Sequence, residues 1–122
     1  TLKKKVIPHI AKRGWFKGLD GRKVIVPSEH KTLAGMLQNG ESVIMKHSAL
    51  QWVRQAKQMG IDFKLVTWPH DEWQTEVCGT YATAEKLGEI QRQSFVDVGV
   101  KFDMVCPLAG STDIGRNWRD TH

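Results

Sequence analysis

The tripeptide His70-Asp71-Glu72 is the part of the sequence best suited to chemistry. Its two adjacent carboxylates follow Pro69 in a stretch whose flanks alternate as strands do, so we expect them at the tip of a β-hairpin. A hard divalent cation such as Mg²⁺ prefers carboxylate oxygens and keeps other coordination positions for water and phosphates. Such a tip can bind a catalytic metal, although Asp and Glu are also ordinary solvated turn residues.

The strands that would hold this tip are predicted from short β-branched or alternating runs. These runs lie at residues 23–26, ended by Pro27, in the two arms of the hairpin within residues 62–78, and at residues 100–106, ended by Pro107. The carboxylates then belong to the connection between the two hairpin arms.

Two helices are predicted from apolar residues that recur at three- and four-residue steps. The first is capped by Ser28 and runs to about Met59, with Gly40 as a candidate break and Gly60 as its stop. The second runs from a Thr83 cap to Gly99. Together the elements predict an α+β fold, in which an antiparallel β-hairpin and short sheet are covered by two long helices.

The charge is concentrated at the start of the chain. The net charge is +5, and the first 23 residues hold eight Lys and Arg side chains against a single acidic one, Asp20. A basic end on a near-neutral body suggests a surface for a polyanion, and the alternative is a solvated tail. No apolar run approaches the roughly 20 residues of a membrane span. The start lacks a signal peptide and an initiator Met, so we expect an intracellular protein that is processed at its front.

The cysteines and tryptophans are interpreted as structural residues. Cys78 and Cys106 form no CxxC pattern, so we expect two reduced, partly buried thiols. The tryptophans are expected to be packing anchors, because no alternating basic and aromatic pattern is evident around them; they are Trp15, Trp52, Trp68, Trp73 and Trp118.

Three segments occur in a fixed order that is informative as a set. They are Trp15-Phe16-Lys17-Gly18-Leu19-Asp20-Gly21-Arg22-Lys23, then Ser28-Glu29-His30 with Leu37-Gln38, then His70-Asp71-Glu72. This order resembles the family A DNA polymerases, most closely the replicative polymerases of short-tailed bacteriophages, and the ending from Gly115 to His122 is similar as well. The resemblance implies a basic segment at residues 1–22 that leads into the C-terminal part of the polymerase palm at residues 23–122.

The family's third palm motif matches the acidic tripeptide. The resemblance implies that Asp71 is one of two aspartates that hold a pair of Mg²⁺ ions, with Glu72 in a supporting role beside them and His70 near the primer terminus. One ion would activate the primer 3′-hydroxyl and the other would stabilise the leaving pyrophosphate. The implied substrates are primer-template DNA and a deoxynucleoside triphosphate.

The resemblance also implies contacts to DNA. Gln38 matches a glutamine that reaches the minor groove, where the acceptors are similar for all base pairs. His30 lies on the same helical stripe, and Arg22 and Lys23 are candidates for phosphate contacts, the alternative being surface charge. Family members commonly carry Asn where this chain has Ala34, and an aliphatic residue where it has Pro69, which stiffens the turn.

The family's second palm aspartate and its fingers helix have no counterpart in these 122 residues. We therefore expect a chain that is inactive alone and is completed by a second polypeptide that carries the missing motifs, as an excised domain, a truncated gene or the small half of a split polymerase. It would act in the cytoplasm of a phage-infected or prophage-bearing bacterial cell, away from membranes. The alternatives are a non-catalytic DNA-binding module derived from a palm and an unrelated metal-dependent nuclease or phosphotransferase.

Overall fold

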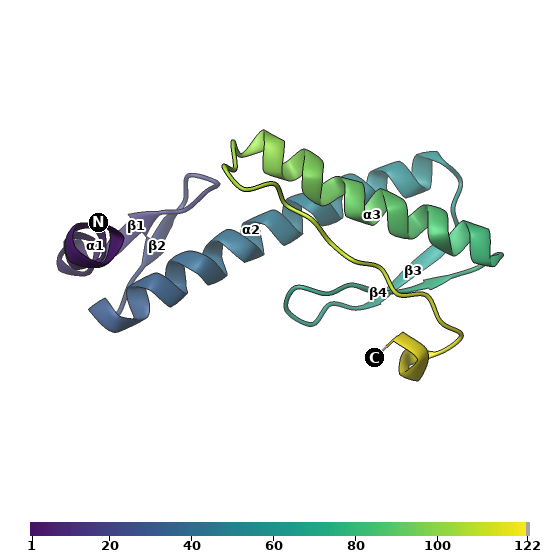
Figure 1. Cartoon of the computed structure of the whole chain (residues 1–122), viewed down its shortest axis with the longest axis horizontal. Helices are drawn as coiled ribbons and strands as arrows, with labels where there is room; N and C mark the ends of the chain where they lie inside the picture. The colour runs from purple at the N-terminus through teal and green to yellow at the C-terminus, as the bar shows by residue number, and fades with distance from the viewer. Residues whose placement is uncertain (122) are drawn as a thin grey trace. The chain divides into compact units, whose positions relative to one another are not determined.

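The computed structural model describes residues 1–121 (Figure 1). The chain consists of two compact units, Thr1–Val43 and Ile44–His122. The α+β class is confirmed. Within the described residues the strands form two separate two-stranded antiparallel sheets. Each strand pairs only with its neighbour in sequence, so both sheets are hairpins. The expected functional boundary after residue 22 stays a prediction.

The first unit is built around a β-hairpin, of which only the second strand was predicted from the sequence. It opens with η1 (Leu2–Val6) and α1 (Ile7–Arg13), continues with β1 (Trp15–Lys17) and β2 (Lys23–Ile25), and includes the start of α2 (Glu29–Gln58). Phe16 pairs with Val24 in the hairpin, and its ring is buried in a small core with aliphatic side chains. The buried members of this core are Ile10, Phe16 and Val26.

Helix α2 confirms the predicted long helix and runs through Gly40 without a break. Its first turn is supported by the Thr32 hydroxyl, which donates to the Ser28 carbonyl at 3.1 Å. The end is a left-handed cap: Gly60 has φ +68°, and the Ile61 amide donates to the Ala56 carbonyl at 3.0 Å. Gly60 is required there because only glycine takes that conformation without a steric cost.

The second unit contains the predicted acidic hairpin, formed by β3 (Phe63–Thr67) and β4 (Gln74–Val77). Its core joins this hairpin to the later part of α2 and to α3 (Tyr81–Lys101), and the ring of Trp52 is fully buried at its centre. The rest of this core consists of Ala49, Ala56, Ile61, Leu87 and Ile90, with Val53, Phe63, Trp73 and Val77 packed against it. The hairpin is therefore covered by two helices, as expected.

Helix α3 departs from the prediction at both ends. Its N-cap is Thr80, whose hydroxyl accepts from the Thr83 amide at 3.3 Å, and Thr83 itself lies within the helix. The expected strand at residues 100–106 is wrong, because the helix continues to Lys101. It ends where Asp103 takes φ +50° and the Met104 amide donates to the Gly99 carbonyl at 3.0 Å.

An extended segment after α3 turns back along the helix and leads to η2 (Trp118–Thr121) (Figure 1). Thr112 donates its hydroxyl to the Gly88 carbonyl at 3.3 Å, and a Cβ at Gly88 would lie only 2.5 Å from the Thr112 methyl group. The extended segment can therefore approach α3 this closely only because Gly88 has no side chain.

Cys78 and Cys106 are free thiols and both are exposed, which corrects the expectation that they are partly buried. Among the described residues, none of the helices combines the length and apolar character that crossing a membrane requires.

Candidate functional site

The acidic tripeptide lies in the connection between β3 and β4. The turn is closed by the Glu72 amide, which donates to the Pro69 carbonyl at 3.0 Å. His70, inside this turn, has φ +50°, a left-handed conformation that is uncommon for a residue with a side chain. The strand register shifts between Leu65 and Thr67 just before the turn. A tight loop of this kind projects the residues at its centre away from the strands.

The two carboxylates of the turn have different surroundings. Asp71 is exposed, whereas Glu72 is half-buried and accepts a hydrogen bond from the side-chain amide of Gln74. On the other arm, the indole Nε1 of Trp68 donates to the His70 carbonyl at 3.2 Å. Asp71 is therefore the carboxylate that the turn presents to solvent, and Glu72 is partly occupied in holding the loop together.

The chemistry of Asp71 suits a hard cation, since an exposed carboxylate leaves room for water and phosphate oxygens around the ion. Residues 1–121 contain no group of three or more His, Cys, Asp or Glu side chains that could hold a metal ion by themselves. Within this part of the chain, Asp71 is therefore not accompanied by a set of side chains that could complete a metal site.

The predicted DNA contacts of α2 all belong to the first unit. His30, Ala34 and Gln38 are exposed and follow one another at four-residue intervals in a continuous helix, so they lie along one stripe. Ala34 offers no polar group, so the hydrogen-bonding groups of the stripe are His30 and Gln38.

The loop between β1 and β2 positions the two predicted phosphate contacts. Arg22 is exposed and forms an ion pair with Asp20, Nε to Oδ2, at 2.5 Å. Although desolvation raises the pKa of Asp20, hydrogen bonds from the backbone and side chain of Arg22 and its positive charge outweigh that effect and lower the pKa below its ordinary value. Arg22 is therefore partly neutralised, whereas no carboxylate within residues 1–121 forms such an ion pair with Lys23.

A basic-aromatic cluster around Trp15 was missed in the sequence. The guanidinium carbon of Arg13 lies 4.0 Å from the centroid of the Trp15 ring, and the ammonium of Lys23 lies 4.9 Å from it. Arg13 also donates to the Trp15 carbonyl at 2.9 Å. The alternation of Arg13, Trp15 and Lys17 along the chain was the available signal, so the expectation that no basic and aromatic pattern surrounds Trp15 was wrong.

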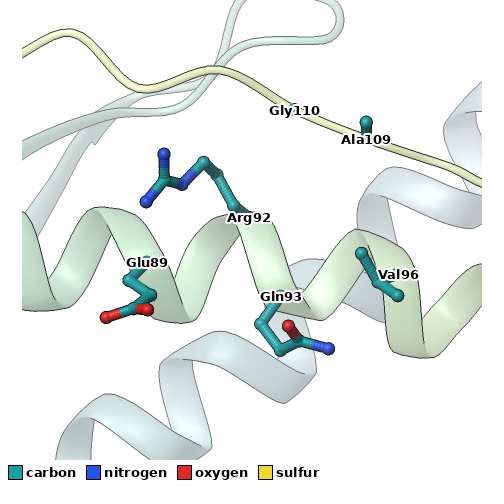
Figure 2. A pocket seen from close by; sticks show the side chains of 6 residues that line it. All are labelled: Glu89, Arg92, Gln93, Val96, Ala109 and Gly110. Atoms are coloured by element: carbon teal, nitrogen blue, oxygen red, sulfur yellow. The ribbon is translucent and has the colours of Figure 1, made fainter.

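An open hollow beside α3 contains none of the predicted site residues. It lies between α3 and the extended segment, and in Figure 2 the side chain of Arg92 extends from the helix on the side of that segment. Its lining residues are Glu89, Arg92, Gln93, Val96, Ala109 and Gly110. Because none of the predicted site residues lines this hollow, we place the candidate site at the acidic turn.

Comparison with known proteins identifies the class: the chain is homologous to a part of the DNA-directed DNA polymerases of bacteriophages. It is 33% identical over 117 residues to the DNA-directed DNA polymerase of Enterobacteria phage T3, and equally so to that of Escherichia phage T7. It is 31% identical over 122 residues to that of Escherichia phage Phieco32. The recognition of a phage polymerase segment in the sequence is confirmed.

The matches cover very different fractions of this chain and of its relatives. They cover 91–92% of this chain but only 16–19% of the relatives, so the chain spans less than a fifth of their length. No family model matches the chain.

Proposed function

We propose that this chain forms the C-terminal part of the palm of a family A DNA polymerase and supplies one metal-binding aspartate, Asp71, to template-directed nucleotidyl transfer. The observation that carries the proposal is the exposed carboxylate of Asp71 at a hairpin tip, in a chain homologous to phage DNA polymerases. Glu72 supports the turn through Gln74, and His70 lies beside Asp71, where a primer terminus would be close.

Magnesium is the metal that fits this proposal. Bound Mg²⁺ would supply charge stabilisation for phosphoryl chemistry, and Asp71 would hold it together with carboxylates from other parts of the polymerase. The role of the turn is to keep the Asp71 carboxylate exposed and oriented, since catalysis of this kind depends on positioned charge.

The first unit would contact the primer-template. Gln38 and His30 are exposed donors and acceptors on one stripe of α2, suited to minor-groove contacts that do not depend on sequence. Lys23 and Arg22 would contact phosphates, with Lys23 the stronger because Arg22 is paired with Asp20. The deoxynucleoside triphosphate would bind the completed enzyme, in the cytoplasm of an infected or prophage-bearing bacterium.

We further propose that the second metal-binding aspartate and the nucleotide-binding residues come from a second polypeptide or another part of a longer one, so that residues 1–122 by themselves do not extend a primer. The test is to mix the purified chain with a polypeptide bearing those motifs and to measure Mg²⁺-dependent primer extension. Extension should require both components and should be lost with Asp71→Asn but kept with Asp113→Asn, an exposed aspartate outside the turn. Extension by this chain alone would contradict the proposal.

A second candidate function is DNA binding without chemistry. It is favoured by the cluster of Arg13 and Lys23 on Trp15 in a unit whose first 23 residues are strongly basic. Binding of this kind would weaken steeply with salt and would survive Asp71→Asn. A chain that binds primer-template but supports no extension with any complementing polypeptide would favour this candidate.

A further inference from the structure

The left-handed residue of the acidic turn is held from one side by a tryptophan. His70 has φ +50°, and its carbonyl oxygen accepts a 3.2 Å hydrogen bond from the indole Nε1 of Trp68. A residue with a side chain persists in this conformation only when its surroundings favour it. The bond from Trp68 is a contact of this kind, since it engages the peptide group that joins His70 to Asp71.

Trp68 is in turn connected to the core by aromatic contacts. Its ring meets the edge of Trp73 at a centroid distance of 5.9 Å, and Trp73 stacks on Phe95 of α3 at 5.0 Å with 9° between the planes. Trp73 also lies 5.6 Å from the buried ring of Trp52 in α2. A series of rings therefore leads from the well-packed core to the His70 carbonyl.

We propose that Trp68 is a positioning residue that fixes the orientation of Asp71 for metal binding by holding the carbonyl of His70. Trp73 carries this restraint to the helices. The metal-binding part of this inference rests on the function proposed above, and the restraint on the turn does not. Trp68 touches no reacting group in this assignment, and it acts only through the backbone between His70 and Asp71.

The indole N–H can be removed with little loss of ring contact. Trp68→Phe deletes the donor and keeps an aromatic edge for Trp73, and Trp118→Phe is the matched control because Trp118 is an exposed tryptophan in η2. In ¹⁵N relaxation of the full chain, Trp68→Phe should lower the order parameter of the Asp71 amide from the rigid value of about 0.85 to about 0.6 or less. The control should leave it unchanged.

The second readout is the metal requirement of the reconstituted polymerase. Trp68→Phe should raise the Mg²⁺ concentration for half-maximal extension about tenfold, as is typical when a residue that orients a metal ligand is lost. A merely structural role would lower the Tm and leave this concentration where it was. The Trp118→Phe control should change neither quantity.

The outcomes separate the two proposals. Unchanged order at Asp71 in Trp68→Phe overturns the inference outright. A mobile turn with an unchanged Mg²⁺ requirement, in an enzyme that Asp71→Asn inactivates, refutes the positioning role and leaves the proposed function standing. If Asp71→Asn retains full extension, the proposed function fails, and the metal-binding part of the inference fails with it.

Discussion

Trp73 and Phe95 stack with their ring centroids 5.0 Å apart and their planes 9° apart, which joins the loop just before β4 of the acidic hairpin to α3. Both residues are half-buried. The hairpin has only two strands, and an isolated hairpin is marginally stable in water, so it depends on contacts of this kind with the helices. The position of the acidic turn therefore depends on the packing of two aromatic rings that are distant in the sequence.

Removing one of these rings should destabilise the second unit. Phe95→Ala is expected to lower the free energy of unfolding by about 2 kcal/mol, less than for a fully buried phenylalanine because Phe95 is half-buried. Val105→Ala is the control, since Val105 is 98% exposed and its change should stay within about 0.5 kcal/mol. Urea denaturation followed by tryptophan fluorescence measures both, and equal midpoints for the two variants would show that the stack contributes nothing.

Two helical glycines should respond oppositely to the same substitution. Gly88→Ala places a methyl group 2.5 Å from Thr112, so the extended segment must shift and the chain should lose about 1–3 kcal/mol. Gly35→Ala meets no atom within 4 Å, and alanine's higher helix propensity should stabilise the chain by about 0.5–1 kcal/mol. Thermal unfolding of the pair checks the signs, and a stabilised Gly88→Ala would show that the segment does not pack there in solution.

The two carboxylates of the turn should differ in importance. Asp71→Asn is expected to lower Mg²⁺-dependent extension by the reconstituted polymerase at least about 100-fold, because the proposed metal ligand is lost. Glu72→Gln should cost only about tenfold, since the side chain acts through its contact with Gln74 and not on the metal. Initial rates over a range of Mg²⁺ concentrations distinguish the roles, and equal losses would mean that both carboxylates bind metal.

The salt dependence of DNA binding should show which basic residues of the first unit contact phosphates. Each phosphate contact contributes about 0.9 to the slope of log K against log salt for duplex DNA, so Lys23→Gln should reduce that slope by about 0.9. Arg22→Gln should reduce it by less, because Asp20 already neutralises much of this charge. Fluorescence anisotropy with a primer-template measures the slopes, and Lys57→Gln at the end of α2 is the control. A Lys57→Gln effect as large as that of Lys23→Gln would refute a specific contact.

The loop between β1 and β2 should be sensitive to acid. Arg22 lowers the pKa of Asp20 below the ordinary value of 3.8, so the folded state binds this proton less readily than the unfolded chain. The stabilisation is therefore complete above that ordinary value and is lost as the pH falls through the pKa of the folded state. An NMR titration of the Asp20 carboxyl carbon should give a midpoint below 3.8 that rises in Arg22→Gln. A midpoint that is the same in both proteins would exclude the ion pair as its cause.

Several features could be predicted from the sequence because they depend on nearby residues. The three- and four-residue steps of apolar residues gave α2 from its first turn to the Gly60 cap, and the alternation around residues 62–78 gave the acidic hairpin. The order of three short motifs was enough to identify a polymerase segment, since it depends on residue types and spacing alone. The roles of Asp71 and Gln38 remain predictions.

Other features depended on contacts between distant residues, and the sequence does not show these. Residues 100–106 are apolar enough for a strand, yet α3 continues to Lys101, and Leu108 of the returning segment lies so close to Gly99 that a Cβ there would be 3.1 Å from its side chain. Likewise, Lys23 meets Trp15 only because β2 pairs with β1. Local periodicity determined α2, most of α3 and the acidic hairpin, and side-chain packing across elements decided which groups surround the acidic turn.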